Sequence, residues 1–292
     1  MSNNVWKLSR RAFLGGVAYL GGLGLVGCGQ SAPQNNSAQS GSSSKPEATK
    51  DDSVLLVGSE IAFPPYEWLT DTETEFTAPV QGGGYVDGLD VTLAKLIAKE
   101  LGKDLLFVNM SFSGLIDALN LGKVDIVLSG MGDSPERAKV VAFSYSYYDS
   151  VYGLMVKKGN PYENAKETTD FSGAGVLGQK NSPLDEMIDQ IPGVNHLEPV
   201  EHVPDMFEAL EAGKCDAVTV PVETAGTYMN MYPDLVLITP QNPRLDPGFT
   251  GTCAALRKDD TETLDVVNRV IESLSKEDLQ RLYDEAEARQ AQ

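Results

Sequence analysis

Two rhythms of apolar and polar residues take turns along the chain between residues 54 and 289. Short runs that are almost wholly apolar, such as VLLVGS (54–59) and VDIVLSG (124–130), are typical of strands buried in a parallel sheet. Runs with an apolar residue at every third or fourth position, such as DVTLAKLIAKELG (90–102), predict amphipathic helices. The alternation of the two indicates an α/β protein.

The same patterns predict the remaining elements, and these fall in two blocks. Further strands are expected at 105–110, 175–178, 215–220, 235–238 and 251–258. Further helices are expected at 112–122, 182–191, 205–213, 222–232, 261–274 and 276–289. Two blocks of strand–helix alternation predict two lobes.

The first residues follow neither rhythm. Arg10 and Arg11 precede an apolar stretch from Ala12 to Gly27, and no acidic residue precedes or interrupts it. This order is typical of an export signal, and the arginine pair suggests the twin-arginine route. The stretch is too short and too rich in glycine for a comfortable membrane span. It ends in LVGC, which resembles a bacterial lipobox, so we expect cleavage before Cys28 and lipidation of that cysteine. The alternative is a signal anchor with an incidental cysteine.

The composition of the chain, above all its excess of acidic residues, bears on which kinds of partner it can bind. Residues 29–52 contain almost no large apolar side chain and predict a flexible tether. The formal charge is −19, and loss of residues 1–28 leaves 20 basic and 42 acidic residues. An excess of acid argues against nucleic acid and anionic lipid headgroups as partners. We expect Cys215 and Cys253 to be buried free thiols, with one bridge as the alternative.

The segment GMGDSPERAKVV (130–141) places an arginine where the backbone is already positive. Ser-Pro at 134–135 predicts a helix start, so Arg137 lies in the first turn at the positive end of the helix dipole. Gly130 and Gly132 let the backbone approach a ligand closely. The planar guanidinium suits a carboxylate. Together they predict a carboxylate seat; the alternative is a surface arginine paired with a neighbouring acid.

Several segments, in this order, resemble those of the extracellular solute-binding proteins of polar amino-acid ABC uptake systems. They are GSEIAFPPYEW, VDGLDVTLAKLIAKELG, FSGLIDALNLGKVDIVLSGM, SPERAKVVAFSYSYY and LEAGKCDAV. The resemblance covers nearly everything after the tether. It implies a type II periplasmic-binding fold, in which two α/β lobes are joined by two crossing strands and the ligand lies in the cleft.

The resemblance also implies domain boundaries. Lobe 1 would comprise residues 53–150 and 254–292, and lobe 2 would comprise residues 154–249. The crossings would be SVYGL (150–154) and TGTCA (250–254).

Site residues of lobe 1 follow from the same resemblance. Arg137 would grip the ligand α-carboxylate, while the Gly130 carbonyl and the Gly132 amide would hold its amino and carboxylate groups.

Three further residues complete the lobe 1 side of the site. Phe63 and Phe112 would stack on the ligand side chain, and Glu60 would face a polar or cationic ligand group. The alternatives are ordinary core packing for the two phenylalanines and a solvated acid for Glu60.

Lobe 2 departs from the family pattern. Gln179 and Ser182 fit the second anion turn, but Asn181 replaces a glycine and Pro183 removes an N–H group.

The expected partner of the ligand ammonium is also altered. Pro221 stands where the family carries an acid, and we expect Glu223 to substitute for it. The alternative is a ligand without an α-ammonium, with Glu223 capping a helix that starts near Val222.

Two segments stay outside this scheme. The loop 69–85 is longer than the family usually has, and we favour an exposed hairpin over a cleft-edge lid. HLEPVEH (196–202) contains two His and two Glu residues but matches no strong metal motif.

The sequence therefore predicts a monomeric, lipid-anchored binding protein that delivers a small carboxylate, most simply an amino acid, to an ABC permease. It needs no cofactor and is not an enzyme. The alternatives are a cyclohexadienyl-dehydratase-like enzyme on the same scaffold, with Glu223 or Glu60 as general acid, and a ligand-presenting sensor module. No nucleophile–base pair, metal motif or phosphate loop supports the enzyme.

Overall fold

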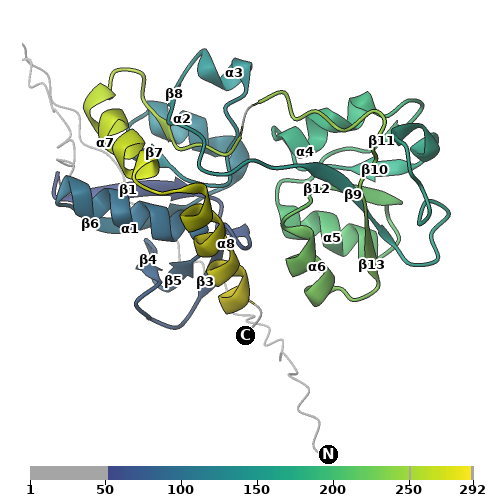
Figure 1. Cartoon of the computed structure of the whole chain (residues 1–292), viewed down its shortest axis with the longest axis horizontal. Coiled ribbons are helices and arrows are strands. Elements are labelled where there is room, and N and C mark those ends of the chain that lie inside the picture. Colours follow the sequence, from purple (N-terminus) through teal and green to yellow (C-terminus); the bar gives the residue numbers. More distant parts are fainter. Residues whose placement is uncertain (1–51, 250, 291–292) are drawn as a thin grey trace, which may run out of the picture. The chain divides into compact units, whose positions relative to one another are not determined.

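The computed structural model describes residues 52–249 and 251–290 (Figure 1). The predicted export signal and Cys28 lie outside the described residues, as does the tether except for Asp52. Within the described part, no helix is both long enough and apolar enough to cross a membrane.

One five-stranded sheet draws on both ends of the described chain. Its strand order is β6-β1-β7-β14-β8, and β14 runs antiparallel to both of its neighbours. The strands are β1 (Val54–Ser59), β6 (Asp104–Asn109), β7 (Ile126–Val127), β8 (Ala142–Phe143) and β14 (Ala255–Leu256). We call the part of the molecule built on this sheet lobe 1.

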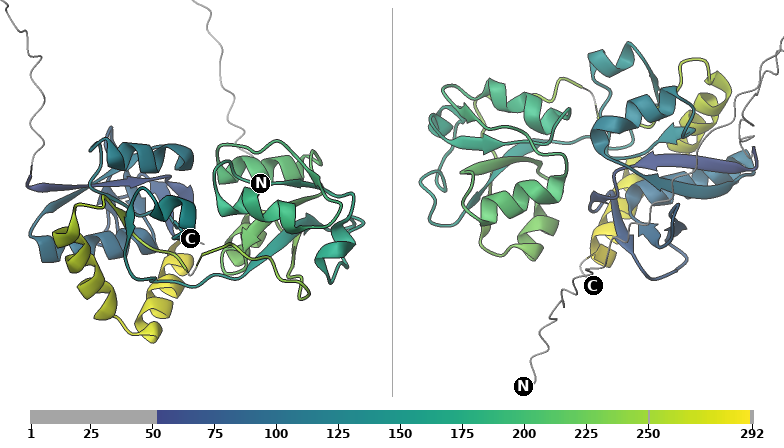
Figure 2. Two further views of the ribbon diagram at one scale, coloured as in Figure 1. Left: turned by 90° about the horizontal axis from the view of Figure 1, so that it is seen from above. Right: turned by 180° about the vertical axis from the view of Figure 1, so that it is seen from behind.

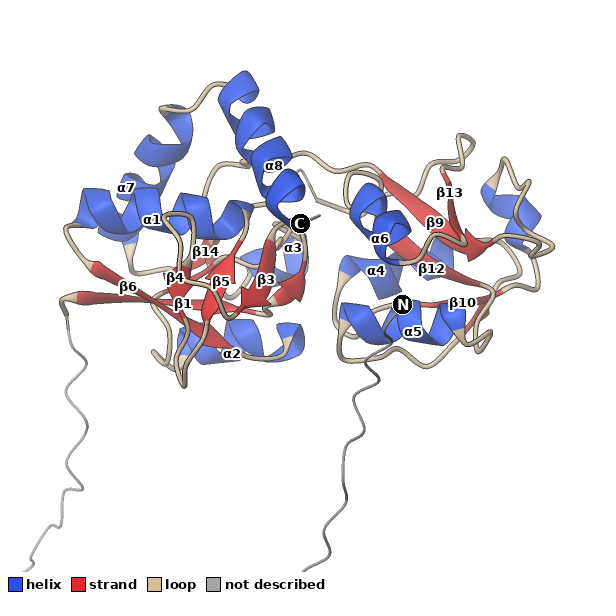
Figure 3. Ribbon diagram, turned by 90° about the horizontal axis from the view of Figure 1, so that it is seen from below, coloured by secondary structure: helices blue, strands red, loops and turns tan. Residues whose placement is uncertain are grey.

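The helices of lobe 1 pack on both faces of this sheet. They are α1 (Leu89–Leu101), the 3-10 turn η1 (Phe112–Gly114), α2 (Leu115–Asn120), α3 (Pro135–Ala138), α7 (Thr261–Glu272) and α8 (Lys276–Gln290). One core joins α1, α7 and α8 to the sheet, and a second core joins α2 to its other face (Figure 3).

A second five-stranded sheet has the order β11-β10-β12-β9-β13 and supports lobe 2. Its strands are β9 (Tyr152–Lys157), β10 (Gly175–Leu177), β11 (Asn195–His196), β12 (Ala217–Pro221) and β13 (Leu235–Ile238). Its helices are η2 (Thr168–Phe171), α4 (Pro183–Glu186), η3 (Met187–Gln190), α5 (Val203–Glu211) and α6 (Ala225–Met231). These elements enclose one apolar core of their own.

Two stretches of chain run between the lobes, one between β8 and β9 and one between β13 and β14 (Figure 2). On the lobe 1 side they are joined, because the Thr252 N–H donates to the Tyr148 carbonyl at 2.7 Å. The Cys253 N–H donates to the Met131 carbonyl at 2.8 Å. The second stretch is thereby tied to the segment that carries Gly130 and Gly132.

A small antiparallel sheet of lobe 1 has the order β2-β3-β5-β4. Its strands are β2 (Ala62–Phe63), β3 (Glu67–Thr70), β4 (Ala78–Pro79) and β5 (Tyr85–Asp87). The long loop 69–85 therefore forms paired strands, as expected for a hairpin, and its residues 71–76 are exposed.

Most predicted elements occur in the predicted order, but several are shorter. The strand expected at 124–130 pairs only at Ile126–Val127, because the residues after it turn to bond site groups instead of a neighbouring strand. The helix expected at 182–191 divides into α4 and η3. The patterns missed β8, β9, β11 and the small sheet. Cys215 and Cys253 are buried and free, so the alternative of a bridge is wrong.

Candidate functional site

Arg137 lies at the start of α3 and contacts both lobes. Its backbone N–H reaches the Ser134 hydroxyl at 3.4 Å, as expected for an N-terminal cap. Its guanidinium donates from Nη1 to the Gly132 carbonyl and from Nη2 to the Asn181 carbonyl, both at 3.0 Å. Its Cζ lies 5.2 Å from the centroid of the Phe112 ring, within cation–π range. Burial lowers the pKa of Arg137, but an arginine retains its charge at neutral pH.

A cavity of about 280 Å³ lies beside this guanidinium. Both lobes line it, because Asn181 and Glu186 come from lobe 2 and the other lining residues come from lobe 1. They are Phe112, Ser113, Ile116, Met131, Ser134, Glu136, Arg137 and Val140. Of the predicted site residues, Phe112 and Arg137 therefore share one cavity.

The two site glycines are required for different reasons. Gly130 has φ +56°, and a Cβ there would lie 2.9 Å from the Phe63 ring. A Cβ at Gly132 would lie 2.6 Å from the Phe249 ring. Close packing of aromatic rings on the backbone thus explains both glycines.

Two buried carboxyl groups lie beneath Gly130 and were not predicted. The Gly130 N–H donates to Asp90 at 2.8 Å, and the Tyr147 hydroxyl donates to the same carboxylate at 2.8 Å. Burial raises the pKa of Asp90 to about 6 and raises that of Glu67 well above its usual range. The neighbouring Asp90 charge also raises the pKa of Glu67, so Glu67 is the acid of the two that more strongly favours its neutral form. The feature of the sequence that could have revealed this pair is Asp90, an acidic residue in the buried first turn of the amphipathic helix α1.

Glu60 connects the lobes. Its Oε2 accepts a hydrogen bond from Gln179 at 2.5 Å, and its Oε1 lies 2.6 Å from His202 Nδ1. Burial raises the pKa of Glu60, and the hydrogen bond to Glu60 raises the pKa of His202. The structure therefore brings together the predicted residues Glu60 and Gln179 and adds His202, which sequence reasoning did not select.

A second contact between the lobes lies nearby. The Ser113 hydroxyl, in η1, donates to Glu201 at 3.0 Å, and Lys180 pairs with the same carboxylate at 2.5 Å. The lobes thus meet through hydrogen bonds and charged groups at this edge of the site.

Ser182 serves α4 in the structure. Its hydroxyl accepts the Leu184 N–H at 3.2 Å and donates to the Gln179 carbonyl at 2.8 Å. Asn181 adopts φ +57°, a conformation that asparagine tolerates better than most residues. The turn keeps the glycine-like backbone of the family pattern although its residue differs.

Glu223 lies at the crossing instead of at a helix cap. Its Oε1 accepts hydrogen bonds from the Ser150 hydroxyl and, at 3.3 Å, from the Tyr66 hydroxyl. Burial raises the pKa of Glu223. Helix α6 starts at Ala225 with no side-chain cap bond. Tyr66 in turn stacks on Phe63 with 5.4 Å between ring centroids. The Tyr66 ring therefore links Glu223 to Phe63, a predicted ligand contact.

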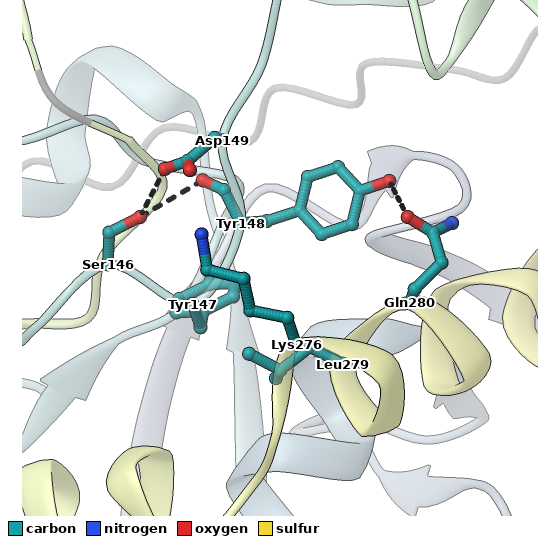
Figure 4. Close-up of a pocket in the computed structure, with 7 residues that line it drawn as sticks. All are labelled: Ser146, Tyr147, Tyr148, Asp149, Lys276, Leu279 and Gln280. Atoms are coloured by element: carbon teal, nitrogen blue, oxygen red, sulfur yellow. Dashed lines mark hydrogen bonds between the residues drawn. The ribbon is translucent and has the colours of Figure 1, made fainter.

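Another cavity, of about 240 Å³, opens on lobe 1 between residues 146–149 and the start of α8 (Figure 4). The Tyr148 hydroxyl crosses its edge to reach Gln280 at 3.2 Å. None of the predicted ligand-binding residues lines it.

The segment 196–202 does not assemble a metal site. His196 bonds to Asp185 and Asp189, whereas His202 bonds to Glu60. Among the described residues there is no group of three or more His, Cys, Asp or Glu side chains that could hold a metal ion.

Comparison with known families decides the class of the protein. Residues 55–286 match the model of the bacterial extracellular solute-binding proteins, family 3. The chain belongs to this family. Among curated relatives of this solute-binding protein, the arginine-binding extracellular protein ArtP of Bacillus subtilis is 26% identical over 220 residues, 75% of this chain and 80% of ArtP. The L-cystine-binding protein TcyJ of Escherichia coli K12 is 27% identical over 230 residues, 78% of this chain and 80% of TcyJ.

Solved structures agree. A Streptococcus pneumoniae amino acid ABC transporter substrate-binding protein bound to L-arginine is 27% identical with a TM-score of 0.72, covering 81% of this chain and 94% of that one. Holo ArgBP from T. maritima is 33% identical with a TM-score of 0.66, covering 78% and 94%. The prediction of a two-lobe type II periplasmic-binding fold is confirmed. These relatives are named as binding proteins, which does not favour the dehydratase-like alternative.

The Glu60–His202 contact predicts a pH-dependent link between the lobes. The folded chain holds the His202 proton more tightly than the unfolded chain does, because the pKa of His202 is raised above 6.5. The stability from this pair is therefore present below that value and lost as pH rises through the folded pKa. In a double-mutant cycle of Glu60→Gln and His202→Gln, we expect clear coupling in unfolding free energy near about pH 6 and little near about pH 8.5.

His196 supplies the matched control for this cycle. Burial lowers the pKa of His196, but hydrogen bonds to Asp185 and Asp189 raise it above its usual value, and both of these partners belong to lobe 2. Glu60→Gln and His196→Gln should be additive at both pH values. Equal coupling of the Glu60 and His202 substitutions at the two pH values would contradict the assignment.

Proposed function

We propose that this chain is the substrate-binding protein of an ABC uptake transporter, and that it takes an amino acid between its lobes and delivers it to a permease. The observation that carries the proposal is Arg137, a charged group stacked over Phe112 and bonded to the backbone of both lobes beside a cavity. Relatives that bind arginine and cystine support an amino acid as the ligand class.

The ligand carboxylate would bind the Arg137 guanidinium. The bonds to Gly132 and Asn181 use two of its five N–H groups, so donors are left for a carboxylate. We place the carboxylate near Gly130 and Gly132, where a ligand would take the place of the Phe63 and Phe249 rings that now cover the two glycines.

The ligand side chain would lie against Phe63 and Phe112 and approach Glu60. A cationic or polar group there would compete with His202 and Gln179 for the Glu60 carboxylate, since both now bond to it. Gln179 and Ser182 would complete the lobe 2 wall from the turn that contains Asn181.

We further propose that the protein is held at the outer face of the cell membrane as a lipoprotein and acts as a monomer. Support comes from the order of arginine pair, apolar stretch and LVGC ending at Cys28. The tether that follows would let the lobes reach a permease while anchored.

The first test is a binding measurement by calorimetry with arginine, lysine, histidine, glutamine and cystine. For the amino acid that binds, Arg137→Ala should weaken affinity by roughly 2–5 kcal/mol, because it removes one partner of a desolvated charge pair. Arg137→Lys should also bind poorly, since an ammonium cannot reproduce the planar fork. Arg281→Ala, at an exposed arginine of α8, is the control and should bind normally. Normal affinity in Arg137→Ala would refute the carboxylate seat.

The second test concerns the ligand ammonium. If Glu223 accepts it, Glu223→Gln should weaken binding of the amino acid strongly and spare the analogue that lacks the amino group. If the ligand has no α-ammonium, the substitution should affect the two compounds equally and the deaminated compound should bind the native chain well. Calorimetry of both compounds with both proteins distinguishes these results.

The third test concerns the anchor. Cys28→Ala should leave folding intact and move the protein from the membrane fraction to the soluble fraction, because lipid attachment is lost. A correctly cleaved variant that stays with washed membranes would show that Cys28 is not the point of attachment.

A further inference from the structure

The largest of the cavities described here lies away from the amino-acid site. It has a volume of about 580 Å³ and lies in lobe 1, where the hairpin between β3 and β5 meets the end of α8 (Figure 1). Its lining contains none of the residues assigned to the amino-acid site. The lining residues are Trp68, Thr70, Thr72, Thr74, Glu75, Phe76, Thr77, Asp87 and Arg289.

The floor of this cavity is held by strong contacts between distant segments. Arg289 donates from Nε and Nη2 to both oxygens of Asp87, at 2.8 to 3.2 Å, and this ion pair is largely buried. The Arg289 guanidinium also lies 4.4 Å from the centroid of the Phe76 ring. Lys95, from α1, donates to the Thr77 carbonyl at 3.0 Å. The hairpin is therefore fixed to α1 and α8, which gives the cavity a defined wall.

The walls combine aromatic rings with hydroxyl groups. Trp68 and Phe76 contribute rings, and Trp68 also carries an indole N–H. Four threonines also line the cavity. The Thr70 hydroxyl accepts the Thr72 N–H at 3.2 Å, and the Thr74 hydroxyl accepts the Phe76 N–H at 3.2 Å. Accepting these bonds leaves each hydroxyl proton able to donate to a ligand.

The charges around the cavity disfavour an anion. The hairpin carries three acids, Asp71, Glu73 and Glu75, which repel an anion. Arg289 at the floor is neutralised by Asp87 and covers one face of Phe76, so the three exposed acids leave the rim of the cavity negative. The rings suit a ligand with an apolar face, and the threonines and Glu75 suit one with hydroxyl groups.

We propose that this cavity binds a neutral saccharide. A sugar ring offers one face of C–H groups, which packs on an aromatic ring, and a rim of hydroxyls that both donate and accept. The volume lies within the range of roughly 300–1,000 Å³ that small-molecule sites occupy. This site is separate from the proposed amino-acid site and does not depend on it.

Trp68 provides a direct probe, because the chain contains only two tryptophans, Trp6 and Trp68. In a Trp6→Phe chain, tryptophan emission comes from Trp68 alone, whether or not the export signal has been removed, and so reports on this cavity. We expect a saturable change in emission on titration with at least one of glucose, N-acetylglucosamine and maltose. Choline and acetate test the cationic and anionic alternatives, and glycerol tests for an effect of the solvent. No saturable response to any of the sugars, or saturation with choline or acetate alone, would overturn the proposal.

A matched pair of variants locates the sugar. In the Trp6→Phe background, Thr72→Val should weaken sugar affinity roughly three- to tenfold, because it removes one hydroxyl contact on an exposed loop. Thr261→Val, at an exposed threonine of α7, should leave it unchanged. Arg137→Ala should leave the sugar response intact even if it abolishes amino-acid binding. Equal affinities in the two threonine variants, or loss of the response in Arg137→Ala, would place the sugar elsewhere and overturn the assignment.

Discussion

The buried carboxylate of Asp90 is the interaction on which the site in lobe 1 depends. It accepts hydrogen bonds from the Gly130 N–H and the Tyr147 hydroxyl, so it joins the start of α1, the turn after β7 and the chain leading to the crossing. A buried charge is stable only when its hydrogen-bonding capacity is met. Burial and the neighbouring Asp90 charge raise the pKa of Glu67, and the Ser129 hydroxyl donates to Glu67 at 3.1 Å. The backbone at Gly130 is thereby fixed before any ligand binds.

The contacts between the lobes resemble the contacts that an amino acid would make. Carbonyl oxygens accept from Arg137 where a ligand carboxylate would accept, and His202 bonds to Glu60 where a cationic ligand group would bond. Exchange of such partners replaces one hydrogen bond with another, so its net free-energy change is small compared with the separation of an apolar interface. Since each lobe keeps its own apolar core, the lobes can exchange these polar contacts without unfolding.

The hairpin 69–85 adds a second kind of surface to the same lobe. The buried pair of Arg289 and Asp87 ties it to the last turn of α8, and Phe76 packs against the same guanidinium. A desolvated pair of this kind is costly to break because each partner would be left as a buried charge. Arg289, close to the end of the described chain, therefore helps to fix the hairpin that lines the cavity, although the hairpin lies more than 200 residues earlier in the sequence.

The sequence by itself determined the alternation of strands and helices, the two blocks and the local cluster of Gly130, Gly132 and Arg137. The elements could be predicted because the period of apolar residues shows which face of each element is buried. The cluster could be predicted because its three residues are close together in the chain. The small sheet was missed because its strands are two to four residues long, too short to show a period.

Only the tertiary structure decided which distant side chains meet. Glu60 and His202 are 142 residues apart, and Asp87 and Arg289 are 202 residues apart. The positions of such partners depend on strand order and on the path of the crossings, which no local pattern encodes. Glu67 and Asp90 show the same limit, because an acid inside an apolar pattern can be explained only when its partner is known. The sequence thus predicted the fold and the grouping of Gly130, Gly132 and Arg137, whereas the long-range pairs that join the lobes required the folded chain.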